Sequence, residues 1–209
     1  MIEHVLNGFF ERDHDRHGTV AQMASYQPIP EALEPSGHTV RWATWDAEHL
    51  DTTTVRWENE GFTVSGALTR ERVDYVVRLS ASWQVRQFIL FRDMEEPDLW
   101  LATDGAGRWG EMNGAHRTEF DGCYDVLLDG AVFTIGLPLR RLPLLEGHTA
   151  ELPLVVVDSE TLEARAEVHR YTRLGQHRWR HEDGVHSREF DVDAHGLVLD
   201  YPEGFRRVS

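Results

Sequence analysis

The sequence predicts a mainly β protein in which a strongly curved antiparallel sheet forms a spiral β-roll or split barrel, with an amphipathic helix appended at the N-terminus. Apolar and polar residues alternate from His38 onward, as expected for strands that bury one face. Turn signals separate these runs at hairpin spacing, and no helical pattern intervenes. A sheet of so many strands twists until it curls, splits or closes.

Residues 1–37 are predicted to be a helix and linker that precede a main domain at 38–209. The apolar residues of the first turns repeat with the spacing of an amphipathic helix: Ile2, Val5, Leu6, Phe9 and Phe10. Three prolines then interrupt regular structure between Tyr26 and Gly37. The helix is expected to dock on the main domain, and a homodimer through the same apolar stripe is the alternative.

Strands are predicted at 40–42, 55–57, 62–68, 73–79, 84–93, 99–103, 151–158, 162–174, 177–182, 188–193 and 197–201. Asp-Gly pairs at Asp104, Asp121, Asp129 and Asp183 mark hairpins or turns. In 162–174 one face is apolar or small up to Val168, and we expect it to line a curved wall. The opposite face, which ends at His169 and Tyr171, is charged with both signs. This pattern is typical of a solvated surface or of the polar lining of an open groove, and we expect solvent to cover most of it.

The composition excludes several classes of protein. The net charge is −15, and all 21 bases are arginine, so the surface repels nucleic acid and anionic lipid. A single cysteine, Cys123, excludes an intrachain disulfide and a multi-thiolate zinc site. No targeting segment and no apolar run of about 18 residues is found, so we expect a cytoplasmic protein that is not integral to a membrane.

The stretch from Asp121 to Leu142 concentrates candidate functional residues. If 121–128 is a strand, Asp121 and Asp125 lie on one face but about 13 Å apart, which is too far for a glycosidase pair. Cys123 is expected to be a buried, inert thiol, because free cysteine is among the most buried residue types.

Two arginines follow in the same stretch. Pro138 and Pro143 flank Arg140 and Arg141, which predicts an edge or corner of the sheet because proline cannot donate to a β-ladder. An arginine that points inward needs a carboxylate, and Asp121 or Asp125 is the expected partner.

Four segments, read together, resemble a small bacterial family described as putative glycolipid-binding: FDGCYDVLL, FTIGLPLRRL, RYTRLGQHRWRHE and GLVLDYPEGFRRV. The resemblance covers about residues 38–208, with the motifs in order. It implies a spiral antiparallel β-roll or split barrel, similar in shape to periplasmic carriers of lipoproteins. The positions that match the family are Asp121, Cys123, Asp125, Pro138, Arg140, Arg141, Tyr171, Asp200, Tyr201 and Pro202.

The favoured hypothesis is therefore a non-enzymatic protein that holds a lipid, glycolipid or similar amphiphile in the cavity of a β-roll. An acyl chain gains about 0.8 kcal/mol for each CH₂ that it buries. No cofactor and no metal are predicted. The expected ligand-binding residues are Asp121, Cys123, Asp125, Arg140, Arg141, Tyr171 and Tyr201.

An enzyme is the alternative hypothesis. It would be a hydrolase that uses Cys123, or a metal site built from His169, His177, His181 and His186. Along one strand, however, His177 and His181 lie about 13 Å apart, too far to share an ion directly. His14 and His17 in the N-terminal extension supply only two ligands, fewer than a structural zinc site needs.

Overall fold

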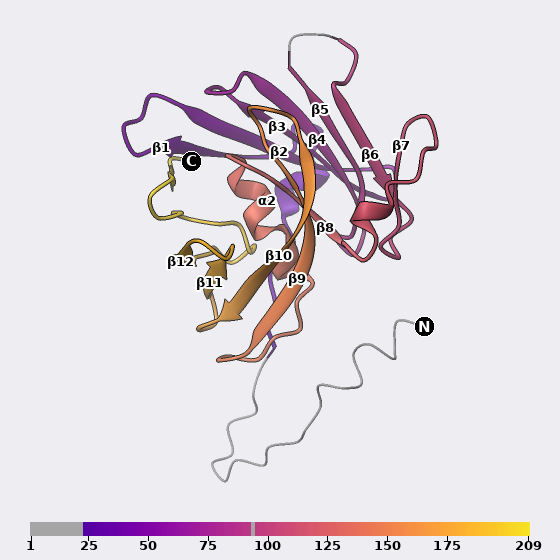
Figure 1. Ribbon diagram of the computed structural model, residues 1–209. Coiled ribbons are helices and arrows are strands. Elements are labelled where there is room, and N and C mark those ends of the chain that lie inside the picture. The colour runs from indigo at the N-terminus through magenta and orange to yellow at the C-terminus, as the bar shows by residue number, and fades with distance from the viewer. Residues whose placement is uncertain (1–22, 93–94) are drawn as a thin grey trace.

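The computed structural model describes residues 23–92 and 95–209, and it consists mainly of two β-sheets (Figure 1). The predicted N-terminal helix, with His14 and His17, lies outside the described residues. Before the first strand, the chain forms the short 3-10 helix η1 (Pro30–Leu33), in which Ala32 is buried. In the described part of the chain, no helix has the length and apolarity needed to cross a bilayer.

The larger sheet is antiparallel and has eight strands in the order β13-β1-β2-β3-β4-β5-β6-β7. The strands β1 to β6 follow one another as hairpins, as the alternating pattern predicts. Their bounds are β1 (His38–Thr44), β2 (Leu50–Glu58), β3 (Gly61–Leu68), β4 (Val73–Ser80), β5 (Val85–Phe91) and β6 (Leu99–Thr103), followed by β7 (Trp109–Glu111) and β13 (Phe205–Arg207). The last two were not predicted.

The smaller sheet is curled like half a barrel and has five strands in the order β12-β11-β10-β9-β8. Their bounds are β8 (Asp125–Leu128), β9 (Thr149–Val157), β10 (Ala164–Arg173), β11 (Arg178–Glu182) and β12 (Ser187–Asp191). The predicted mainly β fold with strongly curved antiparallel pairing is confirmed. It differs in detail, because the strands divide between two sheets and β8 runs parallel to β9.

A parallel pair needs a crossover connection. Here the crossover contains a helical segment, α2 (Val132–Gly136) continued by the 3-10 helix η3 (Leu137–Arg140). The prediction that this stretch forms an edge or corner of the sheet is therefore wrong. Every residue from Val132 to Leu139 is buried, so the segment has no polar face and no amphipathic period to reveal a helix.

Helix α2 lies between the two sheets (Figure 1). It occupies the space for which the sequence predicted an apolar hollow. Phe133, Leu137 and Leu139 fill this space together with large side chains from both sheets, among them Trp42, Trp109, Trp179, Tyr75, Tyr171 and Phe88.

Three local expectations can be compared with the structure. The four predicted Asp-Gly turns are confirmed, since their glycines have φ between 80° and 90°, a range that favours glycine. Residues 121–124 are a turn after η2 (Thr118–Phe120), so the strand begins only at Asp125. The predicted strand at 197–201 is reduced to isolated bridges at Val198 and Tyr201.

Candidate functional site

An open polar groove lies where the β11–β12 hairpin meets the C-terminal turn. We call it the histidine groove, and its volume is about 270 Å³. It is lined by residues from the end of β8, α2, β10, the β11–β12 hairpin and the turn before β13: Leu127, Leu128, Asp129, Gly130, Ile135, His169, His181, Asp183, His186, Arg188, Tyr201, Pro202, Glu203, Gly204 and Phe205.

The floor of the groove is a chain of hydrogen-bonded side chains. His169 Nδ1 lies 2.9 Å from His181 Nε2, and His181 Nδ1 lies 2.9 Å from the Tyr201 hydroxyl. At the other end, His169 Nε2 lies 3.0 Å from a carboxylate oxygen of Glu167. Tyr171 stacks on the His181 ring at a centroid distance of 4.7 Å, which holds this imidazole in place.

Charged side chains of both signs surround this floor. The Arg188 guanidinium lies over the Tyr201 ring, 5.6 Å from its centroid, and within 3.7 Å of carboxylate oxygens on Asp183 and Glu203. His186 Nδ1 is 3.2 Å from Asp183. The groove therefore presents donors and acceptors in close proximity.

Burial and hydrogen bonding set the protonation states in the groove. Burial, reinforced by His169, lowers the pKa of His181 to about 3, so this imidazole is neutral at physiological pH. Burial raises the pKa of Tyr201 to about 12, against the opposing charge of Arg188. Burial alone would raise the pKa of Asp183, but backbone N–H groups of His186 and Val185 lower it to about 2, so Asp183 is anionic.

These pKa values bear on catalysis by the groove. Moving the Tyr201 proton to His181 would create a tyrosinate and an imidazolium from groups whose pKa values are about 12 and about 3. Such a transfer is strongly unfavourable, because burial disfavours both charged forms. His181 is thus too weak a base to activate Tyr201 as a nucleophile, and the arrangement is better suited to hydrogen bonding.

The predicted site residues do not form one cluster. Tyr201 lies in the groove, and Tyr171 is fully buried behind it, where its hydroxyl donates to the Ile135 carbonyl. Asp125 and Arg141 pair with each other at the start of β8, as one of the two expected pairings. Asp121 is exposed and lies 2.8 Å from His116.

Cys123 is buried, as expected. Burial, with a smaller contribution from the charge of Asp121, raises the pKa of its thiol to about 11. The nucleophilic species of cysteine is the thiolate, which is scarce at neutral pH for such a thiol.

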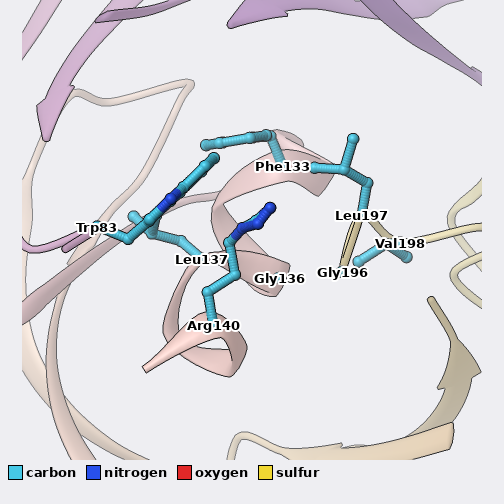
Figure 2. A pocket seen from close by; sticks show the side chains of 8 residues that line it. All are labelled: Trp83, Phe133, Gly136, Leu137, Arg140, Gly196, Leu197 and Val198. Carbon is cyan, nitrogen blue, oxygen red and sulfur yellow. The ribbon is translucent and has the colours of Figure 1, made fainter. Parts of the chain in front are cut away.

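Arg140 belongs to a separate crevice between α2, η3 and the segment Gly196–Val198. Figure 2 shows its guanidinium pointing into this crevice beside Trp83, whose ring centroid is 3.9 Å away. Burial lowers the pKa of Arg140 to about 10. The crevice holds about 10 Å³, which is room for about one water molecule.

The sequence named His169 and His181 only as members of the alternative metal site, and it did not indicate that the two imidazoles are hydrogen-bonded to each other. Contrary to expectation, His169 and Tyr171 on the charged face of β10 are buried, whereas Val168 on the apolar face is 59% exposed. His169 faces His181 across adjacent strands, a relationship that spacing along one strand cannot reveal. Among the described residues, no three His, Cys, Asp or Glu side chains are arranged to hold a metal ion.

The fold is that of a mainly β protein with a large antiparallel sheet and a curled half-barrel sheet, and comparisons with known proteins place it in a family. A family model described as "Putative glycolipid-binding" matches residues 39–207, so the chain belongs to this family and the predicted resemblance is confirmed. A solved structure of a DUF1089 family protein from Pseudomonas aeruginosa is similar, with 25% identity and a TM-score of 0.60 over 95% of this chain and 100% of that chain. No curated protein matches this sequence.

Proposed function

We propose that this protein binds an amphiphile of the glycolipid type and holds its polar headgroup in the histidine groove. The observation that carries the proposal is an open groove of about 270 Å³ lined by both donors and acceptors. Pockets for drug-sized ligands measure roughly 300–1,000 Å³, so this groove suits a headgroup rather than a whole lipid. Membership of a family described as glycolipid-binding supports the same ligand class.

The apolar part of the ligand would lie on the surface beside the groove. Val168 and Val185 are 59% and 85% exposed, and they line shallow depressions adjoining the groove at Asp183 and His186. Covering exposed apolar surface stabilises a complex by about 25 cal/mol per Å². Because α2 and η3 fill the space between the sheets, this proposal places no acyl chain there.

The expected ligand-binding residues take different parts in this proposal. Tyr201 contacts the headgroup, and Tyr171 supports the site by stacking on His181. Asp125 and Arg141 position the start of β8 through their ion pair, and Cys123 packs in the core. Asp121 and Arg140 lie outside the groove.

An NMR titration with octyl glucoside, kept below its micelle concentration, tests the proposal. We expect amide shifts that centre on Asp183, His186 and Tyr201. Arg188→Met should weaken binding about tenfold, because a hydrogen bond from a charged donor is worth about 1.5–3 kcal/mol. Arg178→Met is the matched control, since Arg178 lies in the neighbouring strand β11, pairs with Glu189 and does not line the groove.

Two results would overturn the proposal. One is the absence of any shift with octyl glucoside, combined with a native mass equal to the bare chain for freshly purified protein. The other is a set of shifts around Trp83 and Arg140, which would place the ligand in the other crevice.

A further inference from the structure

The hydrogen-bonded chain under the groove runs without interruption from the surface to the ligand site. Glu167, His169, His181 and Tyr201 are joined by three contacts of 2.9 to 3.0 Å. Both imidazoles are almost fully buried, at 3% and 4% exposure. Glu167 is partly exposed at one end, and Tyr201 lines the groove at the other.

With His169 neutral, the chemistry of the four groups fixes the direction of every hydrogen bond. Burial alone would raise the pKa of Glu167, but hydrogen bonds from His169 and Arg165 lower it, so Glu167 is an ionised carboxylate that only accepts. His169 must then carry its proton on Nε2, and when this imidazole is neutral its Nδ1 only accepts. His181 therefore donates from Nε2, and its own Nδ1 accepts the proton of the Tyr201 hydroxyl.

The geometry points to a directional relay: Glu167 and His169 act through His181 to hold the Tyr201 proton inward, so that Tyr201 presents only acceptor lone pairs to the groove. This inference rests on the proposed function and specifies its ligand. Arg188, whose hydrogen bond lowers the pKa of Tyr201, already uses part of this acceptor capacity. A ligand group that meets the rest must be a donor, such as a sugar hydroxyl or an ammonium group. Glu167 and His169 are positioning residues, because neither needs to touch the ligand.

The charges around the groove favour the same ligand class. Asp129, Asp183 and Glu203 line it, and among the residues that the structure describes Arg188 is the only arginine in its lining. An anionic headgroup would meet these carboxylates as well as an acceptor-only tyrosine. The relay thus selects a neutral or amino-bearing hydroxylated headgroup over a phosphate or a carboxylate.

The direction of the relay can be read from the tautomer of His181 by ¹⁵N NMR at pH 8, where imidazoles with an ordinary pKa are neutral. We expect the Nε2–H form in the native protein. In Glu167→Gln the amide can donate to His169, which allows the whole relay to reverse, and we expect Nδ1–H signal to appear on His181. Glu163→Gln is the control, because Glu163 is exposed, directly precedes β10 and lies four residues before Glu167 in the sequence.

Ligand selection is tested with two probes of the same chain length, octyl glucoside and octyl phosphate. We expect octyl phosphate to bind at least tenfold more weakly than octyl glucoside, and this difference in affinity to shrink in Glu167→Gln but not in Glu163→Gln.

An Nδ1–H form of His181 in the native protein, or an unchanged His181 tautomer in Glu167→Gln, would overturn the relay. Tighter binding of octyl phosphate would overturn the ligand preference but leave amphiphile binding standing, whereas failure of both probes would overturn the proposed function itself.

Discussion

Asp125 and Arg141 form an ion pair that joins the first residue of β8 to the residue after η3. The Asp125 side chain is 3% exposed, and the Arg141 side chain is 22% exposed. The pair therefore links the start of β8 to the end of the helical segment α2–η3, which lies in the crossover between β8 and β9. It also explains how a carboxylate is tolerated in a strand whose four residues are all buried.

Removal of one partner should leave the other buried and unpaired. Arg141→Met is expected to lower the free energy of unfolding by about 3 kcal/mol, because breaking a buried pair from one side is strongly destabilising. Urea denaturation followed by tryptophan fluorescence measures this change. A decrease in the free energy of unfolding smaller than about 1 kcal/mol would contradict a stabilising role for this ion pair.

Arg140→Met is the matched control for that variant. Among the described residues, no carboxylate lies within 4.0 Å of Arg140, which donates to the Gln27 carbonyl and lies over Trp83. A long apolar side chain should fill the same space, so we expect a change within about 1 kcal/mol. Equal losses in the two variants would show that the ion pair is not the cause.

Cys123 should resist alkylation. Its thiol is 1% exposed, and burial raises its pKa to about 11, so both access and thiolate content are low. With iodoacetamide at pH 7.5 we expect a rate well below that of free cysteine, and a rate equal to it in urea. If Cys123 in the folded protein were alkylated faster than free cysteine, the result would support the hydrolase hypothesis.

The strands of this fold were readable from the sequence because their residues alternate with period two. Buried and less buried residues alternate closely in β2 and β4, whereas β9 ends in four consecutive buried residues and β10 in three. Helix α2 escaped prediction because it is buried on all sides, so it lacks the polar face on which the helical period depends. The parallel pairing of β8 with β9 was not predicted either, because a parallel pair requires this crossover.

The candidate site was harder to predict, because it is assembled across strands. Tyr201 was identified through the family motif. The need to neutralise an inward arginine left Asp121 and Asp125 as possible partners, of which the structure shows Asp125 paired with Arg141. The contact between His169 and His181 depends on β10 and β11 being neighbours with Tyr171 opposite His181, a register that no local pattern specifies. The exposure of Val168 likewise follows from which face of β10 turns inward.

Gly66 occupies a core-facing position of β3 because Tyr75 lies directly opposite on β4. A Cβ atom at this position would stand 2.0 Å from the Tyr75 ring, which is itself buried and hydrogen-bonded to Thr53. Gly66→Ala is therefore expected to lower the free energy of unfolding by about 3 kcal/mol, measured in urea. The same substitution in a Tyr75→Leu background should have a much smaller effect, and an equal effect would rule out the ring as the cause.

Asp51 should make the protein less stable as the pH rises. This carboxyl group is fully buried beside the start of α2, where it accepts from the Val132 N–H at 2.8 Å and the Thr53 hydroxyl at 3.2 Å. Burial raises its pKa from 3.8 to about 7, against the effect of these two donors.

At a pH between the unfolded pKa of 3.8 and the folded pKa of about 7, the folded protein keeps a proton on Asp51 that the unfolded chain has released. The stabilising contribution of this group is therefore complete below pH 3.8 and is lost as the pH rises towards about 7. We expect the free energy of unfolding to fall between pH 4.5 and 6.5 by up to about 1.4 kcal/mol per pH unit relative to Asp51→Asn, which has no proton to release. Urea denaturation of both proteins across this range measures the difference, and a difference that stays constant or grows in favour of the native protein would show that Asp51 is ionised in the fold.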